Sequence, residues 1–451
     1  MSDAVIIAII VGCLLIAGLI YAIYLADPPL IKIPSIALKP TVKEKTDPEL
    51  VEEFQINPSK KVRMYVSLKD NTTIEELEKQ GIKVIQKGKY VNYCVVEGDY
   101  ETLQKLVNND KVVKVLKDGK VRAINFKILG RVELKQDLGW NLRAIKADIA
   151  HENGYLGDGA VVAVLDTGVN YKLPELASNY LGGYDCAYDD PDPMDVDGHG
   201  TACASIIVGN GTEYKGVAPH AKFYAVKVLN DQGWGNLSDV VEGLEWCLDQ
   251  INHGKRIDVI SMSFGADTGA PEVKQLLDIL YSKGVILVGA SGNEGKKVSL
   301  YPAAYDSVIS VGAVDSLGNV AEFSNGGAYV SAPGVQVPVL DTNGRIYYGS
   351  GTSFACPHVS GVLLLVRAEK NITPAQAFDL LSKSTDEIND PDDKVLYGEI
   401  NAVKAINAAL NANLSENRNW YDYLKDPVVQ ILVGLTLLVA FFKLKLWREG
   451  S

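Results

Sequence analysis

Apolar positions with strand and helix spacing define a small α/β region near the N-terminus, residues 60–124. These positions predict a strand, a helix, two strands, a helix and a strand, over 62–66, 73–80, 83–97, 100–107 and 111–116. The β-α-β-β-α-β order predicts a ferredoxin-like α+β sandwich. A region of roughly 65 residues has only a small hydrophobic core, so we expect it to be stabilised by packing against a neighbouring domain.

From residue 160 onward the pattern changes to continuous apolar runs that are typical of buried strands. The runs cover 160–165, 222–229, 258–263, 285–289 and 308–314, and helical periodicity lies between several of them, notably over 238–250 and 272–282. Strands that alternate with helices predict an α/β fold, a mostly parallel sheet with helices on both faces. We expect this large domain to cover residues 138–410.

Two terminal stretches are apolar enough to cross a membrane, which predicts two transmembrane anchors. Residues 4–26 carry no charge, and 428–447 span a similar length if the basic side chains near the end snorkel. The N-terminal stretch lacks a basic flank and a cleavage site, which favours an uncleaved anchor over a removed signal peptide. A buried core helix is the alternative for 428–447. Basic residues near the end of this span, at 443, 445 and 448, predict a cytoplasmic C-terminus and place residues 27–426 outside the cytoplasm.

Three linkers separate these parts. Residues 27–59 are rich in proline, which predicts a stiff, extended spacer. Residues 125–137 join the small and large domains, and 411–426 form a polar linker before the second anchor. The formal charge of −12 argues against a nucleic-acid partner, and the six cysteines show neither disulfide-framework nor zinc-site spacing.

Four polar residues lie at strand ends and helix starts. In a parallel α/β sheet, ligand-binding and catalytic residues usually lie at these positions. Asp166 ends a buried strand, His199 lies between glycines, and Asn293 follows another core strand. Ser353 opens an apolar helix after a Gly-rich turn, where the helix dipole favours developing negative charge. Each has a structural alternative: a capping aspartate, a structural histidine, a turn asparagine and a capping serine.

The four motifs together resemble the subtilase family of serine proteases, in which the triad follows the chain order Asp, His, Ser. The resemblance rests on Asp166-Thr167-Gly168, Gly198-His199-Gly200-Thr201, Gly292-Asn293 and Gly351-Thr352-Ser353-Phe354-Ala355-Cys356-Pro357-His358. It implies a serine endopeptidase that acts on protein or peptide substrates and needs no cofactor for its chemistry. Ser353 would be the nucleophile, His199 the general base, Asp166 its partner and Asn293 an oxyanion donor.

The resemblance also implies a zymogen. Residues 60–124 are similar to the inhibitor propeptide of subtilases, which occupies the substrate groove and is removed by autoprocessing. The processing site is expected within 125–137, and the bond stays unnamed. The protein's partners would then be its substrates, its own propeptide and the membrane.

By the same resemblance, two stretches would pair with an extended substrate, Gly233-Trp234-Gly235 and Ser263-Phe264-Gly265. Leu237, Val240 and Phe264 would line an apolar pocket before the cleaved bond. Glu294, next to Asn293, would favour basic residues in the primary pocket.

Several alternatives stay open. An acidic run offers oxygen ligands that suit structural calcium, and a solvated acidic loop is the alternative; its members are Asp185, Asp189, Asp190, Asp192, Asp195 and Asp197. Cys203 and Cys356 lie close in sequence to His199 and Ser353, where small buried fillers are the simplest interpretation. A non-catalytic scaffold with this fold, and an enzyme whose propeptide stays bound, are the rival functions.

Overall fold

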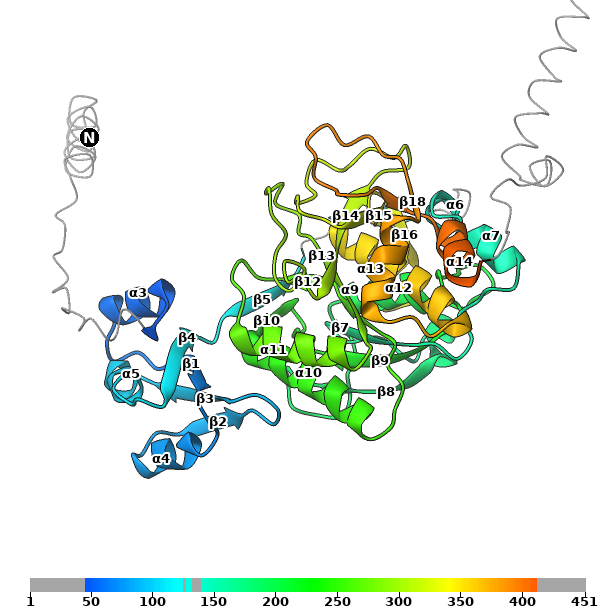
Figure 1. The fold of residues 1–451 in the computed structure, drawn as a ribbon. Helices are drawn as coiled ribbons and strands as arrows, with labels where there is room; N and C mark the ends of the chain where they lie inside the picture. The colour runs from blue at the N-terminus through cyan, green and yellow to red at the C-terminus, as the bar shows by residue number, and fades with distance from the viewer. Residues whose placement is uncertain (1–44, 125–126, 132–138, 412–451) are drawn as a thin grey trace, which may run out of the picture. The chain divides into compact units, whose positions relative to one another are not determined.

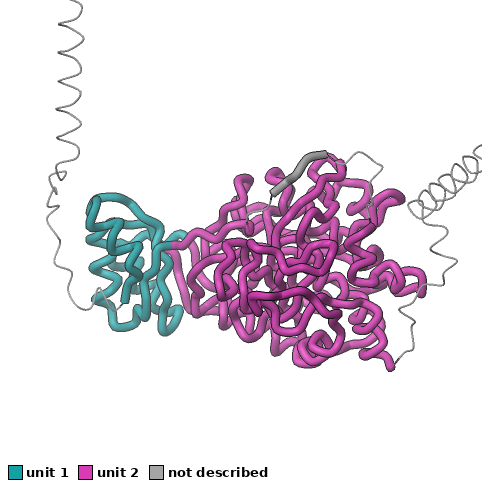
Figure 2. Tube along the Cα trace, turned by 90° about the horizontal axis from the view of Figure 1, so that it is seen from above, with its two compact units in different colours: residues 1–85, 96–117 teal, residues 86–95, 118–451 magenta. Residues whose placement is uncertain are grey.

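The computed structural model describes residues 45–124, 127–131 and 139–411, which form two compact units (Figures 1 and 2). Among the described residues, the first unit contains 45–85 and 96–117. The second unit contains 86–95 and everything described from residue 118 onward.

The first unit carries a four-stranded sheet with the strand order β2-β3-β1-β4. Its elements are α3 (Pro48–Ile56), β1 (Val62–Leu68), α4 (Thr73–Lys79), β2 (Val84–Lys87), β3 (Tyr93–Gly98), α5 (Tyr100–Val107) and β4 (Val112–Lys117). Strand β1 pairs antiparallel with β4, and residues 86–95, which include the end of β2 and the start of β3, belong to the second unit. This order is the one that the ferredoxin-like prediction requires, so that prediction is confirmed.

Helix α3 corrects the expectation of an extended spacer over 27–59. Asp47 caps this helix by accepting a hydrogen bond from Leu50 N at 2.7 Å, and a proline occupies its first turn, where no N–H is needed. Leu50 and Phe54 are fully buried in the unit. The proline at residue 48 therefore marks a helix start, while residues 27–44 lie outside the described part of the chain.

The second unit is built on a nine-stranded sheet in the order β18-β19-β15-β14-β13-β11-β7-β9-β8. The strands are β7 (Val161–Asp166), β8 (Tyr180–Asp185), β9 (Lys222–Lys227), β11 (Val259–Met262), β13 (Ile286–Ala290), β14 (Val308–Val314), β15 (Val330–Pro333), β18 (Thr385–Asp386) and β19 (Glu399–Ile400). Every pair is parallel except β18 with β19. The predicted mostly parallel sheet is confirmed.

Helices pack on both faces of this sheet. They are α6 (Trp140–Ala144), α7 (Ala147–Glu152), α8 (Pro174–Ala177), α9 (His199–Val208), α10 (Leu237–Asn252), α11 (Pro271–Ser282), α12 (Thr352–Glu369), α13 (Pro374–Ser382) and α14 (Ala402–Leu410). In β7, Val162 and Val164 join the apolar cluster around α12, whereas the alternating Ala163 and Leu165 do not. Helices α10 and α11 pack against each other and against β7 and β13.

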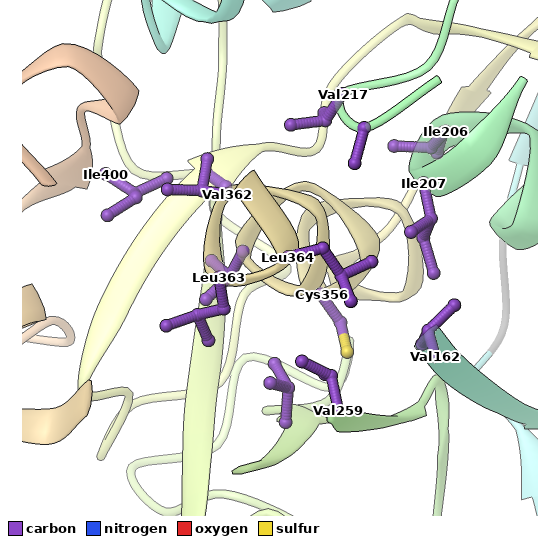
Figure 3. Packing of buried hydrophobic residues seen from close by; sticks show 14 of the residues in the cluster. Val162, Ile206, Ile207, Val217, Val259, Cys356, Val362, Leu363, Leu364 and Ile400 are labelled. Carbon is purple, nitrogen blue, oxygen red and sulfur yellow. The ribbon is translucent and has the colours of Figure 1, made fainter. Parts of the chain in front are cut away.

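Helix α12 is the centre of this core. Its residues from Thr352 to Val366 are buried. Figure 3 shows Val362, Leu363 and Leu364 of this helix among side chains from α9 and from strands of the sheet. The helix that begins beside Ser353 is therefore held rigidly, which fixes the position of the serine.

The second unit also contains two three-stranded sheets. One contains β5 (Lys120–Ala123) between β10 (Trp234–Asn236) and β12 (Phe264–Gly265). The other has the order β16 (Val337–Leu340), β17 (Ile346–Ser350) and β6 (Lys127–Arg131). Strand β6 corrects the expectation that 125–137 is only a linker.

Within residues 45–124, 127–131 and 139–411 we find no helix that combines the length and the hydropathy of a membrane span. The two expected anchors, 4–26 and 428–447, lie outside these residues, as does the expected linker from residue 412 onward.

Candidate active site

Asp166 and His199 form a buried ion pair at the carboxyl end of the central strands. Asp166 is the last residue of β7, and His199 is the first residue of α9. The Nδ1 atom of His199 lies 2.7 Å from Oδ1 of Asp166, and both residues are fully buried. This contact leaves Nε2 as the ring nitrogen on the side away from the carboxylate.

The glycines around His199 permit a close approach of two backbone segments. Gly198 has a φ of +106°, a conformation that L side chains rarely adopt. A Cβ atom on Gly200 would lie 2.0 Å from the carbonyl oxygen of Gly168. The prediction that these glycines mark a close backbone approach is confirmed, since they let α9 start directly against the end of β7.

Ser353 lies in the first turn of α12, beside the Asp166–His199 pair. Its backbone carbonyl accepts hydrogen bonds from Ser263 Oγ at 2.9 Å and from Cys203 Sγ at 3.4 Å. Cys203 Sγ is in turn 3.9 Å from His199 Nδ1, so one cysteine touches both residues. The Ser353 Oγ atom is buried, and it has no hydrogen-bond partner among the described residues.

Asn293 is oriented by the residue that precedes the serine. Its Oδ1 atom accepts hydrogen bonds from Thr352 N and Thr352 Oγ1, both at 2.9 Å. The amide nitrogen is therefore directed away from Thr352. Gly292 makes this turn possible, because its φ is +117° and a Cβ there would lie 2.2 Å from Asn325 Nδ2.

Thr352 is the functional residue that sequence reasoning missed. It couples the serine loop to the asparagine loop, since its Oγ1 also accepts a bond from Gly292 N at 3.1 Å. A threonine beside a serine in a Gly-rich turn is the available signal, but only the fold shows that it faces Asn293.

The electrostatics of the pair set the proton affinity of His199. Burial lowers the pKa of His199, but the adjacent Asp166 carboxylate raises it, and the net direction is well above the ordinary value. Burial raises the pKa of the Cys203 thiol, so this cysteine stays neutral. The interpretation of Cys203 and Cys356 as buried residues is confirmed.

His358 has a structural role next to the site. Its Nδ1 donates to the carbonyl of Phe354 at 2.7 Å, and its Nε2 accepts from Asn141 Nδ2 at 2.8 Å. Burial lowers the pKa of His358 to about 4, so the ring is neutral at physiological pH. This side chain ties the first turns of α12 to helix α6.

Two buried carboxylates of the acidic run accept hydrogen bonds from N–H and hydroxyl groups of the protein itself. Asp195 accepts bonds from Thr167 Oγ1, Thr201 Oγ1 and two backbone N–H groups, while Asp185 accepts from the N–H groups of residues 187 and 188. Over the described ranges, the clustered potential metal ligands are Asp166, His199 and Cys203, within 4.8 Å of one another. Calcium in the acidic run stays a prediction.

The groove beside the serine is lined by the two stretches expected to pair with substrate, and the chain's own residues 120–124 lie between them. Strand β5 pairs antiparallel with β10 and with β12. Asp118 fixes the start of this segment by accepting bonds from Ser238 N at 3.1 Å and Ser238 Oγ at 2.8 Å.

The expected apolar pocket is present, and Val121 is one of the residues that line it. Leu237, Val240 and Phe264 line this pocket together with Val273, and about 20 Å³ of space is left. Glu294, by contrast, pairs with Arg122 at 2.7 Å. Glu294 therefore contacts a residue of β5, and its expected role in the primary pocket stays a prediction.

A buried carboxylate–imidazole pair beside a helix-start serine, at the strand ends of a parallel sheet, serves nucleophilic acyl transfer. The chain is accordingly a serine-type endopeptidase.

The comparison with known proteins gives the family. The family model described as "Subtilase family" matches residues 157–402, so the chain belongs to the subtilase family. It is 39% identical over 259 residues to a thermostable alkaline protease of Halalkalibacterium halodurans, covering 56% of this chain and 69% of that protein. It is 34% identical over 318 residues to subtilisin E of Bacillus subtilis, covering 68% and 79%. It is 37% identical over 255 residues to a thermophilic serine proteinase of Bacillus sp. (strain AK1), but the match spans only 62% of that protein and 55% of this chain.

Proposed function

We propose that this protein is a membrane-tethered serine endopeptidase that is made as an autoprocessing zymogen and acts on proteins outside the cytoplasm. The observation that carries the catalytic part is the 2.7 Å contact between His199 and Asp166, with Ser353 placed beside them by Cys203 and Ser263.

The triad chemistry assigns one role to each residue. Ser353 Oγ attacks the substrate carbonyl, and His199 Nε2 takes its proton and later donates it to the leaving amine. Asp166 holds the ring through Nδ1 and stabilises the imidazolium as it forms. Because the ring is buried against a carboxylate, the protonated form persists to higher pH than in a free histidine.

The oxyanion of the tetrahedral intermediate is stabilised by Asn293 together with the Ser353 N–H. Thr352 holds Asn293 Oδ1, which directs the Nδ2 donor toward the reacting carbonyl. A preorganised donor of this kind acts only on the charge that develops in the transition state.

Asn293→Ala tests this chemistry. We expect kcat for casein hydrolysis to fall by about 10²- to 10³-fold, the loss typical of removing a side-chain oxyanion donor from a subtilisin-type site, while KM changes little. The matched control is Asn319→Ala, a turn asparagine that bonds Asp315. An Asn293→Ala enzyme with kcat near the wild-type value would rule out this role.

We also propose that residues 60–124 act as the inhibitor of the zymogen. The support is the seating of residues 118–124 in the groove and a second contact on α10. There, Glu245 accepts hydrogen bonds from the backbone N–H groups of Lys89 and Tyr90 at 2.8 and 2.6 Å. Lys89 Nζ also pairs with Asp249 at 2.6 Å.

Glu245→Ala should weaken this inhibition. Its carboxylate is the acceptor for consecutive backbone donors, and charge-assisted bonds are worth about 1.5 to 3 kcal/mol each. We expect the lag before full casein hydrolysis, after processing, to shorten at least tenfold. The control is Asp278→Ala, a carboxylate of α11 that pairs with Lys274. An unchanged lag in Glu245→Ala would count against an inhibitory role for this contact.

The membrane and localisation parts rest on the sequence. Residues 4–26 and 428–447 have the length and apolar character of anchors, and the basic flank of the second one favours a cytoplasmic C-terminus. Processing between the small and large domains would leave the second anchor as the tether.

A further inference from the structure

The pairing of β5 with its two neighbouring strands shows which residue of this segment comes next to Ser353. Arg122 lies opposite Trp234 on one side and Gly265 on the other. The next two residues continue the pattern: Ala123 N donates to Gly233 O at 2.8 Å, and Ile124 N donates to Ser263 O at 3.2 Å. Ile124 is therefore held by the same residue whose hydroxyl bonds the Ser353 carbonyl.

On the other side of Ser353, the chain pairs with the segment that leads into the serine. Lys127 of β6 lies opposite Ser350 of β17, and Ser350 precedes Ser353 by three positions. Ile124 is therefore held on the Ser263 side of the nucleophile, and Lys127 pairs on the Ser350 side.

Two side chains anchor this register. Ile124 is 1% exposed and belongs to the apolar core of the catalytic unit. Val121 is 5% exposed and lines the same apolar pocket as Leu237, Val240 and Phe264. A slip of one residue would remove both from their sites, because neighbouring side chains of a strand point to opposite faces.

Arg122 makes a third and charged contact. Its Nη2 atom lies 2.7 Å from Glu294 Oε1. Glu294 is itself held by Asn325, which donates from Nδ2 to Glu294 Oε2 at 3.0 Å and accepts from Glu294 N at 3.0 Å. Asn325 therefore holds the Glu294 carboxylate in position independently of its contact with Arg122.

We propose that the chain cleaves itself at the peptide bond that follows Ile124, and that Glu294 selects a basic residue two positions before Ile124, where Arg122 lies. This inference rests on the proposed function and names its first substrate and one element of its specificity.

The reaction is a hydrolysis. Ser353 Oγ forms a bond with the carbonyl carbon of Ile124 as its proton passes to His199, and the bond to the following nitrogen breaks as His199 protonates that amine. Water then cleaves the acyl ester, which yields the Ile124 carboxylate and restores the serine hydroxyl.

The first experiment determines both new ends of the processed full-length chain, by intact mass and N-terminal sequencing at early times. We expect a mature chain that begins at residue 125 and a released fragment that ends at Ile124. Ser353-dependent cleavage at a different bond would overturn this inference and leave the proposed function intact. Identical cleavage in the Ser353→Ala chain would instead overturn the proposed function.

The second experiment measures kcat/KM of the processed enzyme on p-nitroanilides of Val-Arg-Ala-Ile, Val-Gln-Ala-Ile and Val-Glu-Ala-Ile. We expect the arginine peptide to be preferred over the glutamine peptide by about threefold to fivefold, as suits a partly exposed ion pair, and the preference to shrink at high salt. Glu294→Gln should abolish the preference, and Glu294→Arg should reverse the order of the charged peptides.

Asp267→Asn is the matched control, since this exposed carboxylate pairs with Lys296. It should keep the arginine preference. Equal rates on the three peptides with the wild-type enzyme, or an arginine preference that survives in Glu294→Gln, would overturn the assignment of Glu294.

Discussion

Ser353→Ala is expected to remain full length and to lose casein hydrolysis by about 10⁶-fold, the loss typical of removing the nucleophile from a subtilisin-type triad. Ser353 Oγ is the group that forms the acyl intermediate, and without it His199 has no hydroxyl to activate at the start of α12. Mass spectrometry of the purified chain and a fluorescent casein assay would measure the two effects.

The matched control for this change is Ser360→Ala. Ser360 is a second buried serine of α12, and its Oγ bonds Ser261 Oγ at 3.0 Å and Cys356 O at 3.1 Å. This variant should process itself and hydrolyse casein much as the wild type does. A Ser353→Ala protein that still processes itself would show that another residue supplies the nucleophile.

Asp166→Asn is expected to lower kcat by about 10⁴-fold, because an amide can donate to His199 Nδ1 and so hold the wrong tautomer. The pH profile should change as well. In the wild type, Asp166 contributes to a raised pKa of His199, so kcat/KM should increase with pH through the neutral and alkaline range as the ring loses its proton. Without the carboxylate, the midpoint of this increase should move to lower pH.

The profile is measured as kcat/KM between about pH 5 and pH 10, the range over which histidine bases titrate in enzymes. Asp192→Asn is the control, because this exposed carboxylate accepts a bond from Tyr171 OH and lies outside the pair. A profile for Asp166→Asn with an unchanged midpoint would contradict the assigned role of the carboxylate.

Much of the catalytic unit is predictable because its strands and helices carry strong periodic patterns. The runs at 161–166 and 308–314 are buried on both faces of the sheet, so they are continuous in apolar residues and easy to recognise. The short strands β5, β6 and β17 carry no such pattern, since pairing with a distant segment, rather than their own apolar residues, makes them strands.

In the candidate site, too, some features can be predicted from local sequence patterns and others cannot. Asp166, His199, Asn293 and Ser353 belong to motifs that end strands or begin helices, and the fold brings Asp166 to His199 and Asn293 to the residue before Ser353. The role of Thr352 and the contact of Arg122 with Glu294 depend on residues that are far apart in sequence. Such contacts are set by tertiary structure, which local patterns do not encode.

The most direct test of the central claim is covalent labelling of the processed enzyme with a fluorophosphonate probe, followed by peptide mapping. We expect one adduct, on Ser353, and its loss in Ser353→Ala but not in Ser360→Ala. A processed, folded protein that forms no adduct, or that carries the adduct on another serine, would contradict the assignment of Ser353 as the nucleophile.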